Sequence, residues 1–387
     1  MSKLDCLFVF KSIGPHHRAY LNDCNRFIRC GLVQVAESDE KYPWTSEVEL
    51  ECAQETLCDQ FPRTRAEIKS VRQAFAAILD RYSPSVVFHG GCYHLSFMRA
   101  IARDTVKNGR ASILMGDSTR ADHTRRPWIE YGKRLLLRGA YDGAICAGTR
   151  SRDYLRTLGF DDHKIWNGVD AVDNDHFAAG AREARSAPGR HRERLGLPPE
   201  YVLCVARHSA EKDIDTLLRA CSRVFRDRLT CSLVLCGSGP LTEHLRRSAT
   251  KLGIADRVHF VGWASYRELP YYYALARVSV LPSVSEPWGL VVNESLASGT
   301  PVIASEVCGC VPELVRRGVS GYTFSPGDSD ELEFVLLRVL QGGLGERSVS
   351  QCQTIVAPWS IRNRTLSIVD CLRAFSAIEE IGAGSAH

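Results

Sequence analysis

The chain has 387 residues, a length that predicts two domains rather than one compact core. Hydrophobic residues make up 44% of the chain and charged residues 24%, as is typical of a soluble globular protein. The formal net charge of +4 does not favour a nucleic-acid-binding protein, because such proteins usually carry a strongly basic domain.

Fifteen cysteines stand singly in apolar contexts, and no CxxC pair occurs. We therefore expect buried free thiols in a reducing cytoplasm and no zinc site. The N-terminal run "LDCLFVF" predicts a buried strand rather than a signal peptide. No segment reaches about 18 uninterrupted apolar residues, so we expect no transmembrane helix.

The first half of the chain alternates short apolar runs with helical patterns, which favours a parallel sheet covered on both faces. The expected strands are residues 4–10, 32–36, 85–89, 113–116 and 144–147. Helices are expected between them, as at residues 65–80 and 95–106. We assign residues 1–180 to an N-terminal Rossmann-like domain.

Residues 181–200 interrupt this pattern. They are rich in Arg, Gly and Pro and have little apolar periodicity. We interpret the stretch as the end of a helix followed by an interdomain linker.

The strand–helix alternation then restarts. Strands are expected at residues 201–206, 232–236, 258–261, 278–282 and 302–304, and helices at 215–226, 241–252, 266–276, 290–297 and 310–317. We assign residues 201–359 to a C-terminal domain and expect a helix within about 360–387 to pack back on the first domain. The predicted fold is therefore two tandem doubly wound α/β domains, with the ligand in the cleft at the carboxyl ends of the strands.

Several strand ends in the second half carry candidate binding residues. Arg207 and Lys212 follow a buried strand and suit a diphosphate, although two solvated loop charges are an equal alternative. Gly237 and Gly239 would let another group approach the backbone, but the full GxGxxG spacing is absent. Val261 ends a strand whose backbone could pair with a base edge; a core strand with a turn is the alternative.

The stretch "SEPWGLVVNESLASGTPVIAS" is the most unusual in the chain. Gly289, Leu290 and Val291 open a helix with unpaired N–H groups, which is a site for an anion. Glu286 precedes this helix start and Glu294 lies about one turn inside it. The alternative is an acid that only complements the helix dipole, and this explains Glu294 less well because its neighbours are apolar.

The order of these motifs resembles the retaining glycosyltransferases of family 4, also called group 1. Their GT-B fold has two Rossmann-like domains that face each other across a cleft. The resemblance is strongest over residues 201–326, and "KIWNGVDAVDNDHF" resembles the end of the family's acceptor domain. It implies a UDP-, GDP- or ADP-sugar as donor, a glycan, lipid-linked or small-molecule acceptor, no tightly bound cofactor and no metal.

The resemblance also implies roles for individual residues. Arg207 and Lys212 would neutralise the departing diphosphate, and Glu286 would contact hydroxyls of the donor sugar. Glu294 would hold the ribose. The remaining donor-binding residues would be Gly14, Gly237, Gly239, Val261, Gly289, Leu290 and Val291.

The chain departs from the family after the strand at 113–116, where many members carry a histidine. Here "ILMGDSTRADHTRR" offers Asp117 and His123 instead. His16 and His17 are further candidates on the acceptor side, with surface histidines at a helix start as the alternative. A nucleotide-sugar epimerase and a two-carboxylate glycoside hydrolase remain competing functions.

Two further features have structural interpretations. The triplets at 173–175, 213–215 and 328–330 have the DxD pattern, but their positions at helix starts favour capping over metal binding. The segment from Arg120 to Arg138 is basic and amphipathic. It could contact an anionic membrane, but we favour a helix whose apolar stripe faces the core.

Overall fold

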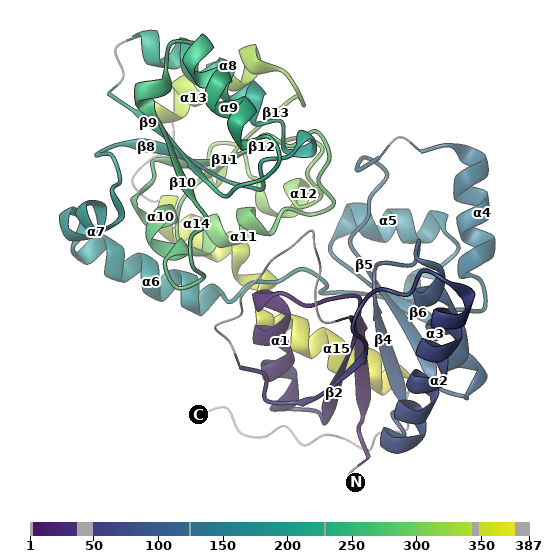
Figure 1. Ribbon diagram of the computed structural model, residues 1–387. Coiled ribbons are helices and arrows are strands. Elements are labelled where there is room, and N and C mark those ends of the chain that lie inside the picture. Colours follow the sequence, from purple (N-terminus) through teal and green to yellow (C-terminus); the bar gives the residue numbers. More distant parts are fainter. Residues whose placement is uncertain (1–2, 37–48, 124, 228–229, 343–347, 376–387) are drawn as a thin grey trace.

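The computed structural model describes residues 3–36, 49–123, 125–227, 230–342 and 348–375. Figure 1 shows two α/β domains, each built on a parallel sheet. The N-terminal sheet has the order β3-β2-β1-β4-β5-β6-β7 and the C-terminal sheet the order β10-β9-β8-β11-β12-β13. In each sheet the chain adds strands on one side of the first strand of the domain and then crosses to add the rest on its other side, as in doubly wound folds.

The elements of the N-terminal domain alternate along the chain. Its strands are β1 (Cys6–Phe10), β2 (Cys30–Ala36), β3 (Ala53–Cys58), β4 (Val86–Gly90), β5 (Ala111–Gly116), β6 (Gly143–Cys146) and β7 (Ile165–Asn167). Its helices are α1 (Pro15–Asn25), α2 (Arg65–Tyr82), α3 (Ser96–Lys107), α4 (Pro127–Leu137) and α5 (Thr149–Thr157).

The C-terminal domain follows the same plan. Its strands are β8 (Tyr201–Val205), β9 (Ser232–Cys236), β10 (Val258–Gly262), β11 (Val278–Leu281), β12 (Val302–Ser305) and β13 (Gly321–Phe324). Its helices are α8 (Ile214–Val224), α9 (Thr242–Lys251), α10 (Leu269–Leu275), α11 (Leu290–Ala297), α12 (Val311–Leu314), α13 (Ser329–Leu340) and α14 (Ser348–Val356).

All ten strands expected from the sequence are present, with ends within two residues of those expected. The prediction missed β3, β7 and β13. The sequence of β3, "AQETLC", has little apolar character because this edge strand is largely exposed. The other two are only three and four residues long, too short for a periodic signal.

The segment predicted as a linker is largely helical, which corrects the prediction. Helices α6 (Asn174–Ser186) and α7 (Pro188–Leu195) occupy most of it. Pro188 begins α7 and Gly196 ends it in the left-handed conformation, as expected for these two residues at helix ends. α6 packs against α10, and within the predicted linker its buried residues are the small Ala181 and Ala184, which give little apolar periodicity.

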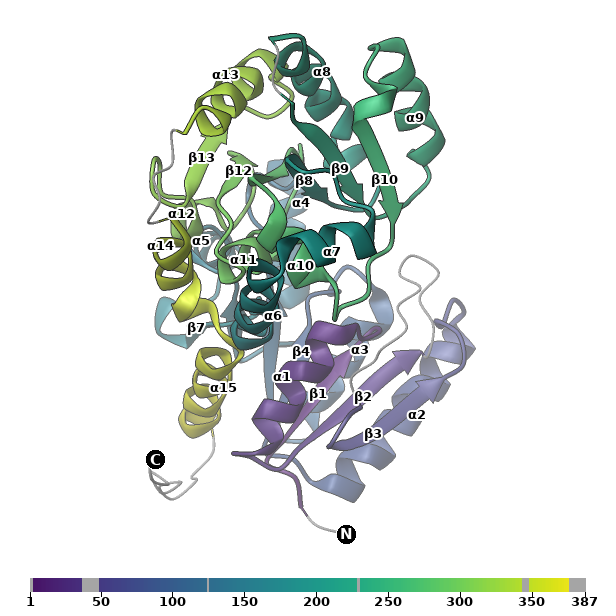
Figure 2. The ribbon, with the colours of Figure 1, turned by 90° about the vertical axis from the view of Figure 1, so that its left-hand side faces the viewer.

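The last helix returns to the first domain. α15 (Ile361–Phe375) lies beside α1 and β7, with Ile368 and Leu372 buried in the N-terminal core. Figures 1 and 2 show this helix reaching from the C-terminal domain back to the N-terminal sheet. Thr365 on α15 donates a hydrogen bond to Asp23 on α1 at 2.6 Å.

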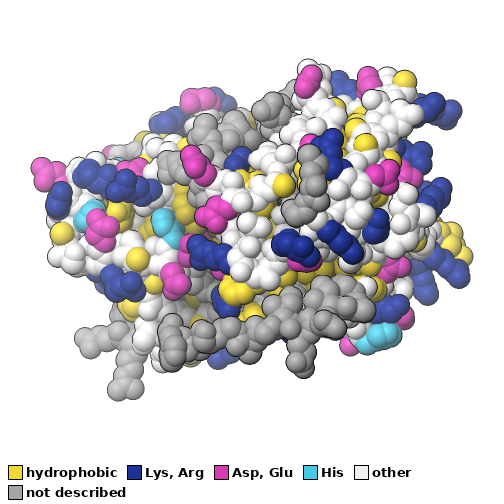
Figure 3. Space-filling model, turned by 90° about the horizontal axis from the view of Figure 1, so that it is seen from below, with side chains coloured by type: hydrophobic (Ala, Val, Ile, Leu, Met, Phe, Trp, Pro, Cys, Tyr) yellow, Lys and Arg dark blue, Asp and Glu magenta, His cyan; other side chains and the backbone are white. Residues whose placement is uncertain are grey.

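All fifteen cysteines are free thiols, and most are buried. Across the described ranges, no helix has both the length and the apolar character needed to cross a membrane. Seen from below, the Lys and Arg side chains that are drawn are interleaved with Asp and Glu (Figure 3).

Candidate functional site

The carboxyl ends of the two sheets face each other, and hydrogen bonds join their loops. Arg150 donates to the carbonyl oxygens of Glu306 and Cys308 at 2.6 and 2.8 Å. The Ser285 hydroxyl donates to the carbonyl oxygen of Asp122 across the same boundary. The loop that follows β5 therefore meets the loop that follows β11, where the glutamate motif begins.

Glu286 and Lys212 form an ion pair on the C-terminal side of this interdomain boundary, which we call the cleft. Both side chains are mostly buried, and the Ser283 hydroxyl donates a further hydrogen bond to Glu286 at 3.1 Å. Burial lowers the pKa of Lys212, but the charge of Glu286 outweighs it, so that the pKa lies above its usual value. The two residues that the sequence places in separate roles are thus one paired unit.

The backbone around Glu286 is held by the Cys308-Gly-Cys310 segment. The N–H of Gly309 donates to the carbonyl oxygen of Glu286 at 3.1 Å, and that of Cys310 to Trp288 at 3.1 Å. A Cβ on Gly309 would overlap the carbonyl oxygen of Pro287, so the close approach requires glycine. This close cysteine pair therefore supports the Glu286 loop through its backbone.

Arg207 is paired with Glu211, a residue that sequence reasoning missed. Burial raises the pKa of Glu211, but hydrogen bonds from its own backbone and from Ser209 and the ion pair with Arg207 together lower it to about 2. The Glu211 carbonyl oxygen also accepts from the Val284 N–H at 2.9 Å. The signal was the spacing of four residues between Arg207 and Glu211, which suits an ion pair across one turn.

Helix α11 begins at the cleft, as predicted. Gly289 precedes it with φ of 103°, and a Cβ there would lie 2.9 Å from Leu281. The N–H groups of Leu290 and Val291 are in the first turn and have no acceptor within the helix. Inside the helix, Glu294 accepts a hydrogen bond from the Tyr273 hydroxyl at 2.8 Å, and burial raises its pKa to about 7.

Gly237 and Gly239 lie close to the protein's own backbone. A Cβ on Gly237 would overlap the carbonyl oxygen of Ala206, and one on Gly239 would crowd that of His208. Both glycines therefore allow the loop that follows β8 to approach closely, and their predicted contact with the donor stays a prediction. The two loops are tied by the bond from the His208 N–H to the Ser238 carbonyl oxygen at 3.0 Å.

Val261 lies at an irregularity of the sheet edge. β10 pairs Phe260 with Leu235 and Gly262 with Cys236, so the ladder skips Val261. Its backbone is thereby set apart from the regular strand pairing. This is the kind of position from which a backbone group can meet a ligand.

The N-terminal wall begins with Gly14, which is buried and precedes α1. Its N–H donates to Nδ1 of His17 at 3.0 Å, and the His17 N–H donates back to the Gly14 carbonyl oxygen. His17 therefore fixes the start of α1. The side chain of His16 lies outside the described part of the structure.

Two acids of this wall share the cleft with Glu286. Burial is the main cause that raises the pKa of Asp117, which follows β5, and the charges of Asp122 and Glu286 add to it. Asp170, which follows β7, has its pKa raised to about 8 by burial first and then by Asp117, while the Arg364 cation opposes the rise. Asp117, one of the candidates in the segment after β5, is therefore buried beside other acids.

Asp170 was missed by sequence reasoning. Its Oδ2 atom is buried and has no hydrogen-bond partner among the described residues. The available signal was "WNGVD", an acid just past the carboxyl end of a strand. By contrast, the predicted candidate His123 is exposed to solvent, and its neighbour Asp122 is buried in the cleft loop.

The DxD triplets are helix starts. Asp173 caps α6 by accepting the His176 N–H at 3.0 Å, and Asp328 caps α13 by accepting two N–H groups. Asp213 precedes α8 and accepts the Thr216 hydroxyl at 2.6 Å. The predicted capping role is confirmed for Asp173 and Asp328.

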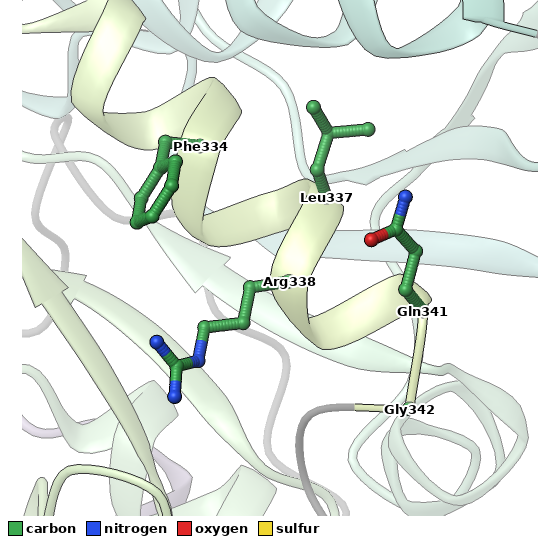
Figure 4. Close-up of a pocket in the computed structure, with 5 residues that line it drawn as sticks. All are labelled: Phe334, Leu337, Arg338, Gln341 and Gly342. Atoms are coloured by element: carbon green, nitrogen blue, oxygen red, sulfur yellow. The ribbon is translucent and has the colours of Figure 1, made fainter.

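An open hollow of about 530 Å³ lies away from the cleft, on the outer face of α13. Figure 4 shows Phe334, Leu337 and Arg338 projecting from this helix around it. The residues that line it are not among those that surround the Glu286–Lys212 pair. We therefore place the candidate site in the cleft and not in this hollow.

Residues 189–351 match the family model described as glycosyl transferases group 1. The chain is 41% identical over 167 residues to the D-inositol 3-phosphate glycosyltransferase of Thermobifida fusca, over 40% of this chain and 38% of that one. It is 38% identical over 157 residues to a GDP-mannose-dependent phosphatidylinositol monomannoside mannosyltransferase of Mycobacterium tuberculosis, over 39% and 40% of the two chains. The matched stretch thus spans about two fifths of each of these relatives.

The structure of Anabaena HepE in complex with UDP and glucose superposes over 96% of this chain and 100% of its own, with a TM-score of 0.73 and 16% identity. The predicted GT-B fold is confirmed by this match, and residues 189–351 match the model of the predicted family. These matched proteins are transferases or carry a transferase fold, and none of them supports the epimerase or hydrolase alternative.

Proposed function

Because residues 189–351 belong to the glycosyl transferases group 1, we propose that this chain transfers a sugar from a nucleoside diphosphate sugar to a hydroxyl group of an acceptor. The observation that supports this most is the Glu286–Lys212 pair, held beside the start of α11 at the carboxyl edge of the sheet. A buried cation next to unpaired helix N–H groups suits a diphosphate leaving group.

In the proposed reaction the bond between the sugar C1 and the diphosphate oxygen breaks, and negative charge develops on the diphosphate. Lys212, Arg207 and the N–H groups of Leu290 and Val291 would stabilise that charge without rearranging. Their positions are already set by Glu286, Glu211 and the helix, which supports preorganisation. Glu286 would orient the sugar through its hydroxyl groups.

The rest of the donor would lie along the C-terminal wall. Glu294 would accept hydrogen bonds from the ribose hydroxyls in place of the Tyr273 hydroxyl that it now binds. The backbone of Val261 would meet the base, because the strand ladder leaves it unpaired. Gly14 would face the donor from the opposite wall.

The acceptor hydroxyl would attack C1, and its proton would leave on the diphosphate oxygen. We propose that the product keeps the anomeric configuration of the donor, as the resemblance to retaining enzymes implies. The acceptor would be a glycan or a lipid-linked sugar. The Mycobacterium tuberculosis relative, named as a phosphatidylinositol monomannoside mannosyltransferase, supports the lipid-linked class.

We further propose that the reaction takes place in the cytoplasm, at the inner face of the membrane. Fifteen free thiols, most of them buried, support a reducing compartment. This proposed cellular location does not depend on the proposed transfer reaction.

The test is a panel of UDP-, GDP- and ADP-sugars, followed by thermal shift and by release of nucleoside diphosphate. We expect one base to raise the melting temperature and Lys212→Ala to lower turnover at least about 100-fold. Lys251→Ala, on the exposed face of α9, is the matched control and should leave turnover unchanged. Full turnover of Lys212→Ala with the identified donor would contradict the proposed site.

A further inference from the structure

Helix α4 exposes its apolar side chains rather than burying them. Trp128 is 68% exposed and Tyr131 65%, and Ile129, Leu135 and Leu136 are also exposed. Among residues 127–137, all of which the structure describes, Leu137 is the one buried residue. The interpretation that the apolar stripe of α4 faces the core is therefore wrong.

The exposed residues form one continuous face. At about 100° per residue, the five large side chains and Gly132 cover an arc of about 160° on the helix surface. Nothing lies within 4 Å of a Cβ placed on Gly132, so the middle of this face is open. We call this face, formed by residues 128, 129, 131, 132, 135 and 136, the α4 apolar face.

The opposite side of α4 is what anchors it. Glu130 accepts hydrogen bonds from Lys133 at 2.9 Å and from the Tyr154 hydroxyl of α5 at 2.6 Å. Leu137 packs against Tyr154 and Leu158. These polar contacts hold the helix on the domain and leave the α4 apolar face toward solvent.

The exposed charged side chains of residues 120–138 are all cationic. Arg126, Arg134 and Arg138 on or beside α4 are exposed, as is Arg120 in the preceding loop. The two acids of the same segment, Asp122 and Glu130, are engaged by Arg125 and Lys133 instead. The described surface of this segment therefore combines exposed aromatic and aliphatic side chains with unneutralised cations.

From this combination we propose that α4 lies along the surface of a membrane that contains anionic phospholipid. The apolar face would enter the region between the headgroups, and the arginines would contact phosphate groups at its edge. The Arg126 guanidinium already lies 5.8 Å from the centre of the Trp128 ring, so a cation and an interfacial aromatic are held together.

The position of α4 links this surface to the cleft. The loop before α4 contains Asp122, whose carbonyl oxygen accepts the Ser285 hydroxyl beside Glu286. Docking through α4 would therefore bring the cleft loop close to the lipid surface, where a lipid-linked acceptor would be found. This consequence rests on the proposed function, whereas lipid binding by α4 does not.

The experiment is co-sedimentation of the full chain with vesicles of phosphatidylcholine alone or with about one third phosphatidylglycerol. We expect binding to the anionic vesicles only, and weaker binding at high salt. The double variant Trp128→Ser/Leu135→Ser should lower the partition coefficient about tenfold or more, and Arg134→Glu/Arg138→Glu should remove the preference for anionic lipid.

The matched control is Phe334→Ser, because Phe334 on α13 is 63% exposed and has Arg338 one turn away. It should bind vesicles like the wild type. Melting curves with and without nucleoside diphosphate check that each variant folds and binds donor, so a failure of lipid binding is distinct from a failure of the proposed reaction. No binding of the wild type to anionic vesicles at low salt would overturn the proposal. A self-association that Trp128→Ser abolishes, without vesicle binding, would overturn it as well.

Discussion

The two walls of the cleft differ in how their charges are compensated. On the C-terminal wall, Lys212 is paired with Glu286 and Arg207 with Glu211. On the N-terminal wall, burial raises the pKa of both Asp117 and Asp170, and Arg364 only partly offsets the rise for Asp170. The two cations of the C-terminal wall are therefore paired before any ligand binds, whereas on the N-terminal wall a buried oxygen of Asp170 has no hydrogen-bond partner among the described residues.

This difference suggests a division of work. A wall whose ions are already paired can meet a charged diphosphate without reorganising, which suits the donor. A buried carboxyl group such as that of Asp170, whose pKa is raised to about 8, keeps its proton near neutral pH and can donate a hydrogen bond, which suits a neutral hydroxyl group of an acceptor. The predictions below test each wall in turn.

The largest effect is expected from Glu286→Gln on the C-terminal wall. The change keeps the shape of the side chain but leaves the Lys212 cation without its partner and weakens its hold on the donor sugar. We expect kcat to fall about 100- to 1000-fold in a nucleoside diphosphate release assay. Glu243→Gln, on the exposed surface of α9, is the control. Equal kcat values for the two variants would mean that the pair does not act in transfer.

Gly309→Ala should disturb the C-terminal wall by displacing the backbone of the loop that carries Glu286. The added Cβ would overlap the Pro287 carbonyl oxygen, so the loop that carries Glu286 has to move. We expect a loss of about 2–4 kcal/mol in the free energy of unfolding, measured by denaturant titration, together with a loss of turnover. Gly132→Ala on α4 meets no atom within 4 Å and should be neutral or slightly stabilising. A variant at Gly309 as stable as the wild type would show that the loop is not tightly held.

The C-terminal wall was largely predictable because its residues follow buried strands in chain order. The cations, Glu286, Glu294 and the start of α11 all lie on local motifs, so their neighbourhood could be inferred without knowledge of the other domain. Asp170 had only one local signal, its place just past a strand, and the Arg364 cation that acts on it comes from α15, almost 200 residues further along the chain. Such long-range packing leaves no local pattern.

The same limit applies to two other features. The close contact of Gly237 and Gly239 with Ala206 and His208 joins separate loops and leaves no local signal. The stripe of α4 has the period of a core helix, and period alone does not tell which side faces solvent. Only the contacts of Glu130 and Leu137 with the domain decide its orientation.

A smaller effect concerns pH and Glu294. Burial raises the pKa of Glu294 to about 7, so part of the side chain is protonated at neutral pH. A carboxylate accepts hydrogen bonds from two ribose hydroxyls better than a carboxylic acid does. We expect nucleoside diphosphate affinity, measured by calorimetry, to rise severalfold between pH 6 and 8. Glu294→Gln should bind more weakly and without this dependence; if its affinity followed the same pH curve, another group would be responsible.

The smallest expected effect tests the N-terminal wall through Asp170. Its pKa of about 8 in the folded chain lies above the usual value near 4 in an unfolded chain, so between these values the folded state holds a proton that the unfolded state has lost. The free energy of unfolding should therefore decrease as pH rises from about 5 to 8. Asp170→Asn removes this contribution, because an amide does not titrate. The melting temperature of the variant relative to wild type should rise over that interval by about 2–4 °C. Asp153→Asn, an exposed aspartate on α5, should show no such trend.

If the Asp170→Asn and wild-type melting temperatures stayed parallel from pH 5 to 8, Asp170 would be ionised in the folded chain. The N-terminal wall would then be charged like its counterpart, and the division of work between the walls would not hold.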